Sequence, residues 1–174
     1  MKKWLITFSL LIQLASAQFL NQTPPPQVKK NAAGQNIIFD YALSLKGLTT
    51  TEVSLTQYQD QPLVIFYFSS LCPHCKKAFP QVQAIYNKYK DLGVQAMAIS
   101  VSYNSRPSVL QFAKNMNAKM PFTQDSASQF SKKYGVGHIP VVLLVRPDGS
   151  YLVFDHVDSQ LVDLEAQLKL ITSQ

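Results

Sequence analysis

The chain's two cysteines stand three positions apart, shortly after an apolar run, and this arrangement constrains the fold more than any other feature. Residues 63–68 (LVIFYF) are continuously apolar and rich in β-branched and aromatic side chains, which predicts a short strand buried on both faces of a sheet. Pro73 directly follows Cys72, and proline favours the first position of a helix because its φ is preset and its missing N–H is not needed there. We therefore expect a strand, a turn and a helix, with Cys72 near the N-cap.

This position gives the sulfur of Cys72 a specific chemistry. The unpaired N–H groups of a first helical turn and the positive end of the helix dipole stabilise an anion beside them. A thiolate is such an anion, so we expect Cys72 to be nucleophilic at neutral pH. His74, between the cysteines, can add a hydrogen-bond donor or a positive charge. We interpret Cys72 as the attacking thiol and the more shielded Cys75 as the thiol that resolves the mixed disulfide.

Two other interpretations of the cysteine pair stay open on the residues alone. A Cys-x-x-Cys motif can be half of a structural zinc site, but there is no second cysteine pair, and only His74, His138 and His156 could complete four ligands. The pair could also form a plain structural disulfide. We favour a redox-active dithiol, which needs no metal and no cofactor beyond the Cys72–Cys75 disulfide.

The amino terminus has the composition of an export signal. A basic start at residues 1–3 precedes an apolar stretch over residues 4–14 and a small-x-small cleavage site that ends at Ala17. The apolar stretch is too short to span a bilayer. We predict a signal peptide over residues 1–17, cleaved after Ala17, and a periplasmic or secreted protein of the bacterial cell envelope. An uncleaved anchor is the alternative.

The rest of the chain is organised as an arm and one domain. Residues 18–36 contain three consecutive prolines and few apolar side chains, which is typical of a linker or N-terminal arm. Residues 37–174 suffice for one domain. Without Lys2 and Lys3, 14 of the 16 basic residues remain against 10 acidic ones, a net charge of +4. The lysines are scattered, so nucleic-acid binding is not expected. With no dimerisation arm in the sequence, we expect a monomer.

Hydrophobic periodicity predicts alternating strands and helices in this domain. Strands are expected at residues 37–45 and 49–55 as an N-terminal hairpin, and at 63–68, 94–101, 141–145 and 151–154; helices are expected at 73–90, 107–116 and 126–134 and at the carboxyl end. Pro80 should bend the first helix. Asp158 or Ser159 can cap the last helix, whose apolar stripe comprises Leu161, Leu164, Leu168 and Ile171. The pattern predicts an α/β domain with a parallel core and a late antiparallel hairpin.

Three features together resemble a thioredoxin-fold oxidoreductase: the Cys-Pro-His-Cys motif at residues 72–75 after an apolar strand, Pro80 five residues beyond it, and Ile139-Pro140 before the late hairpin. The Pro-His dipeptide is similar to that of DsbA. The overall arrangement over residues 37–171 is closer to the exported TlpA/ResA-type redoxins. This resemblance implies a thioredoxin-like fold, a central mixed sheet flanked by helices, with an N-terminal hairpin and a β-α insertion.

The resemblance also implies roles for the segment before the late hairpin. Pro140 would be cis and pack beside the cysteines, the backbone of Ile139 would pair with a substrate strand, and His138 would face the rim of the site. Pro73 and Pro80 would form the framework of the active-site helix. The substrates would be cysteine-containing proteins, and a membrane redox partner would re-oxidise or re-reduce the pair.

The chain departs from the family's pattern at three positions. Many TlpA/ResA-type proteins carry a glutamate where this chain has Ala78, and thioredoxins and DsbA carry a buried acid where it has Phe66. Leu71 replaces the usual aromatic residue. Without these carboxylates there is no obvious internal base to deprotonate Cys75.

The direction of disulfide exchange stays open. The Pro-His pair favours a disulfide donor or isomerase, because it stabilises the reduced thiolate. The TlpA/ResA-like arrangement implies instead a reductant for apocytochrome c or misoxidised proteins. A peroxiredoxin-like peroxidase is less favoured, since Ser69 fits half of that motif but Ile65 stands where proline is needed. A copper or zinc chaperone using the two cysteines and a histidine is the remaining alternative.

Overall fold

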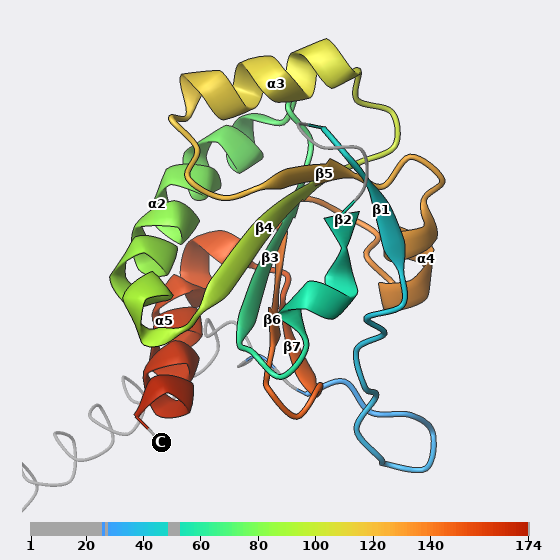
Figure 1. The fold of residues 1–174 in the computed structure, drawn as a ribbon, viewed down its shortest axis with the longest axis vertical. Helices are drawn as coiled ribbons and strands as arrows, with labels where there is room; N and C mark the ends of the chain where they lie inside the picture. Colours follow the sequence, from blue (N-terminus) through green and yellow to red (C-terminus); the bar gives the residue numbers. More distant parts are fainter. Residues whose placement is uncertain (1–25, 27, 49–52, 174) are drawn as a thin grey trace, which may run out of the picture.

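The computed structural model describes residue 26 and residues 28–48 and 53–173 (Figure 1). The predicted signal peptide lies outside the described residues, as do residues 18–25 and 27 of the predicted arm, so both stay predictions. No helix in the described part of the chain combines the length and apolar character needed to cross a membrane.

A seven-stranded mixed sheet forms the centre of the molecule, in the order β2-β1-β5-β4-β3-β6-β7. The strands are β1 (Ser44–Gly47), β2 (Val53–Ser54), β3 (Leu63–Phe68), β4 (Gln95–Ser100), β5 (Phe122–Gln124), β6 (Val141–Val145) and β7 (Tyr151–Phe154). Strand β4 is parallel to both β3 and β5, whereas β6 is antiparallel to β3 and to β7. The predicted parallel core and late hairpin are confirmed.

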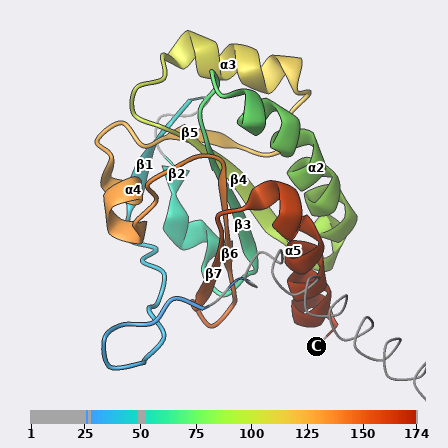
Figure 2. The same ribbon diagram turned by 180° about the vertical axis from the view of Figure 1, so that it is seen from behind.

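Helices cover both faces of this sheet (Figures 1 and 2). They are α2 (Pro73–Tyr89), α3 (Arg106–Asn115), α4 (Gln129–Tyr134) and α5 (Val157–Thr172), with short 3-10 helices at Leu55–Tyr58 and Lys90–Leu92. One core cluster joins the sheet to α2, α3 and α5, and a second joins the opposite face to α4 and the first 3-10 helix. The predicted central sheet with flanking helices is therefore confirmed.

Strand β3 lies between both cores, as its sequence predicts. Val64, Phe66 and Phe68 pack into the cluster beneath α2, whereas Ile65 and Tyr67 point to the α4 side, and every residue of the strand is buried. Alternate side chains of a strand point to opposite faces, so a strand covered on both sides has no polar face. This burial fixes the position from which the cysteine motif begins.

The structure departs from the predicted strands in two places. Strand β5 was not predicted, because its three residues are too few to show periodicity. The first strand begins at Ser44 instead of residue 37, since Asp40 accepts a hydrogen bond from the backbone N–H of Ala42 (2.9 Å) and turns the chain there. Residues 49–52, in the predicted second strand, lie outside the described residues.

The start of the last helix was also predicted wrongly. Helix α5 begins at Val157 after the N-cap His156, so Asp158 and Ser159 lie inside its first turn and neither is the N-cap residue. The buried side chain of Gln160 instead accepts a hydrogen bond from the backbone N–H of His156 (3.0 Å). The predicted apolar stripe of this helix does pack against the core.

Candidate active site

Cys72 lies at the N-cap of α2, four residues after the end of β3. Its backbone is extended (φ −77°, ψ 121°), and Pro73 takes up the first helical position. The backbone N–H of Cys75 donates a hydrogen bond to Cys72 Sγ over 3.3 Å, which satisfies one of the N–H groups that a helix leaves unpaired at its start. The half-buried sulfur thus occupies the place of an N-cap oxygen, where negative charge is favoured.

Cys75 is fully buried one helical turn behind Cys72, and both residues are free thiols. Burial raises the pKa of the Cys75 thiol far above its usual range, and the neighbouring Cys72 thiol raises it further, while the backbone of Ser69 opposes the shift. Ala78 and Phe66, at the positions where the family resemblance implied acids, are fully buried and apolar. Cys75 therefore holds its proton at neutral pH.

Asn104 holds the turn that leads into Cys72. Its Oδ1 accepts from the backbone N–H of Ser70 (2.9 Å), and its Nδ2 donates to Ser69 Oγ (3.1 Å). The three side chains are buried, Asn104 at 4% exposure. A second link joins Ser70 Oγ to Ser108 Oγ (3.0 Å) in the first turn of α3. Because buried polar groups need partners, this network fixes the turn.

Sequence reasoning missed Asn104. It follows β4, which runs parallel to β3, and the carboxyl ends of neighbouring parallel strands meet at one edge of a sheet. That topology was the signal available in the sequence, since it places the segment after β4 beside the segment after β3.

The structure brings His74 to the segment before the late hairpin. A cavity of about 220 Å³ is lined by His74, Ile139, Pro140, Asp155, His156, Val157 and Asp158. The peptide bond between Ile139 and Pro140 is cis, as the family resemblance implied. The two predicted halves of the site, the cysteine motif and the Ile-Pro pair, therefore meet at one end of the sheet.

The remaining predicted residues surround this centre. His138 is exposed, and its Nε2 lies 3.1 Å from the carbonyl oxygen of Asp155, so the ring links its own segment to the start of α5. Pro80 is an exposed residue inside α2, on the helix that carries both cysteines. Lys77, on the same helix, forms an exposed ion pair with Asp158 (3.0 Å).

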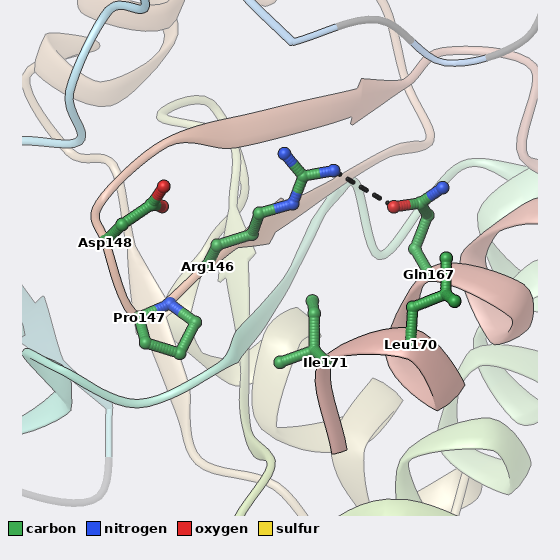
Figure 3. Close-up of a pocket in the computed structure, with 6 residues that line it drawn as sticks. All are labelled: Arg146, Pro147, Asp148, Gln167, Leu170 and Ile171. Atoms are coloured by element: carbon green, nitrogen blue, oxygen red, sulfur yellow. Dashed lines mark hydrogen bonds between the residues drawn. The ribbon is translucent and has the colours of Figure 1, made fainter. Parts of the chain in front are cut away.

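A larger cavity of about 500 Å³ lies at the opposite end of β6 and contains no cysteine (Figure 3). Arg146 reaches from the end of this strand to Gln167 of α5, with Nη2 donating to Oε1 over 3.0 Å. This larger cavity is therefore separate from the Cys72–Cys75 pair. Over residues 28–48 and 53–173 no three His, Cys, Asp or Glu side chains gather into a group that could hold a metal ion.

A protein-family model described as the AhpC/TSA family matches residues 38–151. This chain belongs to the AhpC/TSA family. Relatives of this chain include a thiol-disulfide oxidoreductase ResA of Bacillus thuringiensis subsp. konkukian, 26% identical over 121 residues that cover 70% of this chain and 69% of the relative. ResA of Bacillus subtilis is 27% identical over 97 residues, 56% of this chain and 54% of that protein.

Solved structures of other proteins share the fold of this chain. A secreted Mycobacterium tuberculosis disulfide oxidoreductase homologous to E. coli DsbE superposes with a TM-score of 0.67 at 15% identity, covering 75% of this chain and 96% of that chain. A thiol:disulfide interchange protein of Chlorobium tepidum gives 0.66 at 15% identity, covering 87% and 99%. These comparisons confirm the predicted thioredoxin-like fold, the predicted TlpA/ResA type and the predicted function as a thiol-disulfide oxidoreductase. The likeness of the Pro-His dipeptide to that of DsbA stays a prediction.

Proposed function

We propose that the chain exchanges disulfides with cysteines of other proteins, with Cys72 as nucleophile and Cys75 as resolving thiol. The observation that carries this proposal is the sulfur of Cys72 at the helix N-cap, hydrogen-bonded to the backbone of the buried Cys75. The half-buried thiol can meet a substrate, whereas the buried one can meet only its neighbour.

The proposed reaction has two steps. The Cys72 thiolate attacks a substrate disulfide, forming a mixed disulfide and releasing one substrate thiolate. Cys75 then loses its proton and attacks the Cys72 sulfur, which closes the Cys72–Cys75 disulfide and releases the second substrate thiolate. In the reverse direction the same steps donate a disulfide to a dithiol. No metal or cofactor takes part.

His74, Ile139 and Pro140 are proposed to position the substrate. His74 offers a hydrogen bond or a positive charge beside the reacting sulfurs. Ile139 precedes β6, whose pairing with β3 begins at Val141, opposite Tyr67. The backbone of Ile139 can therefore pair with an extended substrate segment. His138 contributes to substrate contact through the same segment, while Pro73 and Pro80 shape the helix.

We also propose an envelope location, with the signal peptide cleaved after Ala17 and residues 18–36 as an arm before one domain. One solved structure of this fold is described as secreted. The substrates are proteins with cysteines, a membrane protein restores the redox state of the pair, and the enzyme acts as a monomer.

The direction is proposed to be disulfide donation or isomerisation, because His74 favours the reduced thiolate. The similarity to ResA supports reduction as the alternative. A reduction potential between about −120 and −180 mV supports the donor or isomerase, whereas about −250 mV or lower supports the reductant.

Trapping of the intermediate tests the assignment of the two thiols. Reduced Cys75→Ser is mixed with a disulfide-bonded protein and analysed by mass spectrometry without reductant. We expect a mixed disulfide through Cys72, because the thiol that would resolve it is gone. Cys72→Ser should form none, and the wild type should release its substrate. Equal trapping by Cys72→Ser would contradict the assignment. Peroxide consumption by Cys72 without Cys75 would instead support the peroxidase.

A further inference from the structure

A second cavity, of about 330 Å³, opens at the active-site end of the sheet, on the α4 side. Its walls come from the segment after β4, from α4 and from the segment that leads to Pro140. Ile139 lines both this cavity and the one beside His74, and it packs against the core clusters of both sheet faces. Ile139 therefore separates two cavities on either side of the proposed substrate backbone.

The two cavities differ in charge. The cavity beside His74 is lined by two aspartates and two histidines. The lining of the second cavity includes His138 but no Asp, Glu, Lys or Arg, and it carries the hydroxyls of Tyr67, Ser102, Tyr103, Ser128 and Ser131. A lysine or glutamate side chain that entered this cavity would lose its water, and no Asp, Glu, Lys or Arg of the lining could pair with it, which is unfavourable.

The hydroxyls of the second cavity keep hydrogen-bonding capacity for a ligand. The Tyr67 hydroxyl donates to Asp125 Oδ2 (3.2 Å), and Ser128 Oγ donates to Ser102 Oγ (3.0 Å). Each of these donating oxygens retains lone pairs that can accept from a ligand. The cavity therefore suits an uncharged group with a polar tip.

The size and the surroundings of the second cavity further limit which group can occupy it. A volume of 330 Å³ is at the low end for ligand pockets and has room for one large side chain. Tyr103 at its edge is 69% exposed, and Leu71, next to Cys72, is 66% exposed. The two belong to neighbouring segments, because Asn104 bonds to Ser70. Exposed apolar side chains beside the nucleophile offer contact area to an aromatic partner.

We propose that this cavity is a subsite for a tyrosine or tryptophan side chain of the substrate segment that pairs with Ile139. Both side chains combine a large apolar ring with one polar atom, which matches a cavity of aromatic walls and hydroxyl groups. The inference rests on the proposed function, because the substrate cysteine must reach Cys72 while its neighbour fills the cavity.

Peptides with one cysteine, activated as the mixed disulfide with thionitrobenzoate, test the subsite. Cys72 attacks the peptide sulfur and the coloured thiolate leaves; Cys75 then displaces the peptide as a free thiol. Tyrosine, tryptophan, alanine, lysine or glutamate is placed in turn at each of the two positions on either side of the cysteine. At one position the aromatic peptides should react with kcat/KM about tenfold above the alanine peptide, with no gain for lysine or glutamate.

Variants of the cavity complete the test, with the ratio of tyrosine-peptide to alanine-peptide rates as the readout. Tyr103→Ala removes one wall and Ser131→Leu fills the cavity, so each should bring the ratio close to one. Leu92→Ala removes a comparably exposed apolar side chain (59%) that precedes the amino end of β4, whereas the cavity lies beyond the carboxyl end of that strand, and it should keep the ratio.

Three outcomes of these experiments distinguish failure of the subsite from failure of the proposed function. Equal rates for all peptides, or a preference that survives both cavity variants, would overturn the subsite. An enzyme that still reacts with dithionitrobenzoate in those cases retains its proposed function. Failure to react with any disulfide would overturn the proposed function and the subsite with it.

Discussion

At the scale of single residues, the site depends on two thiols that differ in environment. Cys72 receives the backbone N–H of the helix start, while Cys75 is enclosed by apolar side chains and a serine turn. The sequence alone predicted this division, because a strand, a proline and a three-residue spacing fix both positions. It could not predict Asn104, whose contacts join segments 34 and 35 positions apart.

The raised pKa of Cys75 makes resolution of the mixed disulfide dependent on pH. At pH values below that pKa, the fraction of Cys75 present as thiolate rises tenfold per pH unit. Burial is the main cause of the raised pKa, and Cys75 stays buried when Cys72 is linked to a substrate. With excess dithionitrobenzoate, the second release of coloured thiolate should therefore accelerate about tenfold per unit between about pH 6 and 9. Stopped-flow absorbance measures both releases. Cys75→Ser should lack the second one. A second rate that does not change over this range would contradict the prediction.

Asn104→Ala should weaken the fold at the same site. The backbone N–H of Ser70 and the hydroxyl of Ser69 both lose a buried hydrogen-bond partner. We therefore expect the free energy of unfolding to fall by about 2–3 kcal/mol. Urea unfolding of the reduced protein measures the loss. The control Asn115→Ala, on the exposed side of α3, should stay within about 0.5 kcal/mol of the wild type. An equally small change for Asn104→Ala would show that the network does not hold the turn.

At the scale of elements, long periodic segments were predictable, whereas the short strand β5 was not. The core-facing residues of α2 and α5 recur at helical spacing, so both helices were expected. Strand β5 has three residues, and α4, which the sequence predicted over residues 126–134, has six. Both depend on tertiary contacts for their position. Asp125, between them, provides such contacts: it is 1% exposed and accepts from the backbone N–H groups of Phe130 and Ser131 (3.0 Å each).

Asp125→Ala should release α4 from the sheet. The variant removes the acceptor of two helix N–H groups and of the Tyr67 hydroxyl, so we expect a loss of about 2 kcal/mol or more in the free energy of unfolding. Hydrogen exchange of the α4 amides should accelerate with it. Asp163→Ala on α5 serves as the matched control, with a change within about 0.5 kcal/mol. Unchanged exchange in α4 would rule out this anchoring role.

At the scale of the whole molecule, the site forms where one end of a mixed sheet meets two helical layers. The carboxyl ends of β3 and β4 and the amino end of β6 converge there, which brings the cysteine motif, Asn104 and the cis Ile139-Pro140 peptide together. The sequence predicted the two motifs, and the family resemblance implied that they meet. The two cavities beside Ile139 depend on loop positions that no local pattern encodes.

The equilibrium redox titration of the Cys72–Cys75 pair against glutathione tests the central claim most directly. Free thiols are counted by mass spectrometry after acid quenching and alkylation. Our account predicts a single two-electron transition in which both cysteines pass together from thiols to one intramolecular disulfide, and neither Cys72→Ser nor Cys75→Ser should show it. Accumulation of glutathione on Cys72, while Cys75 stays reduced across the whole titration, would contradict the account.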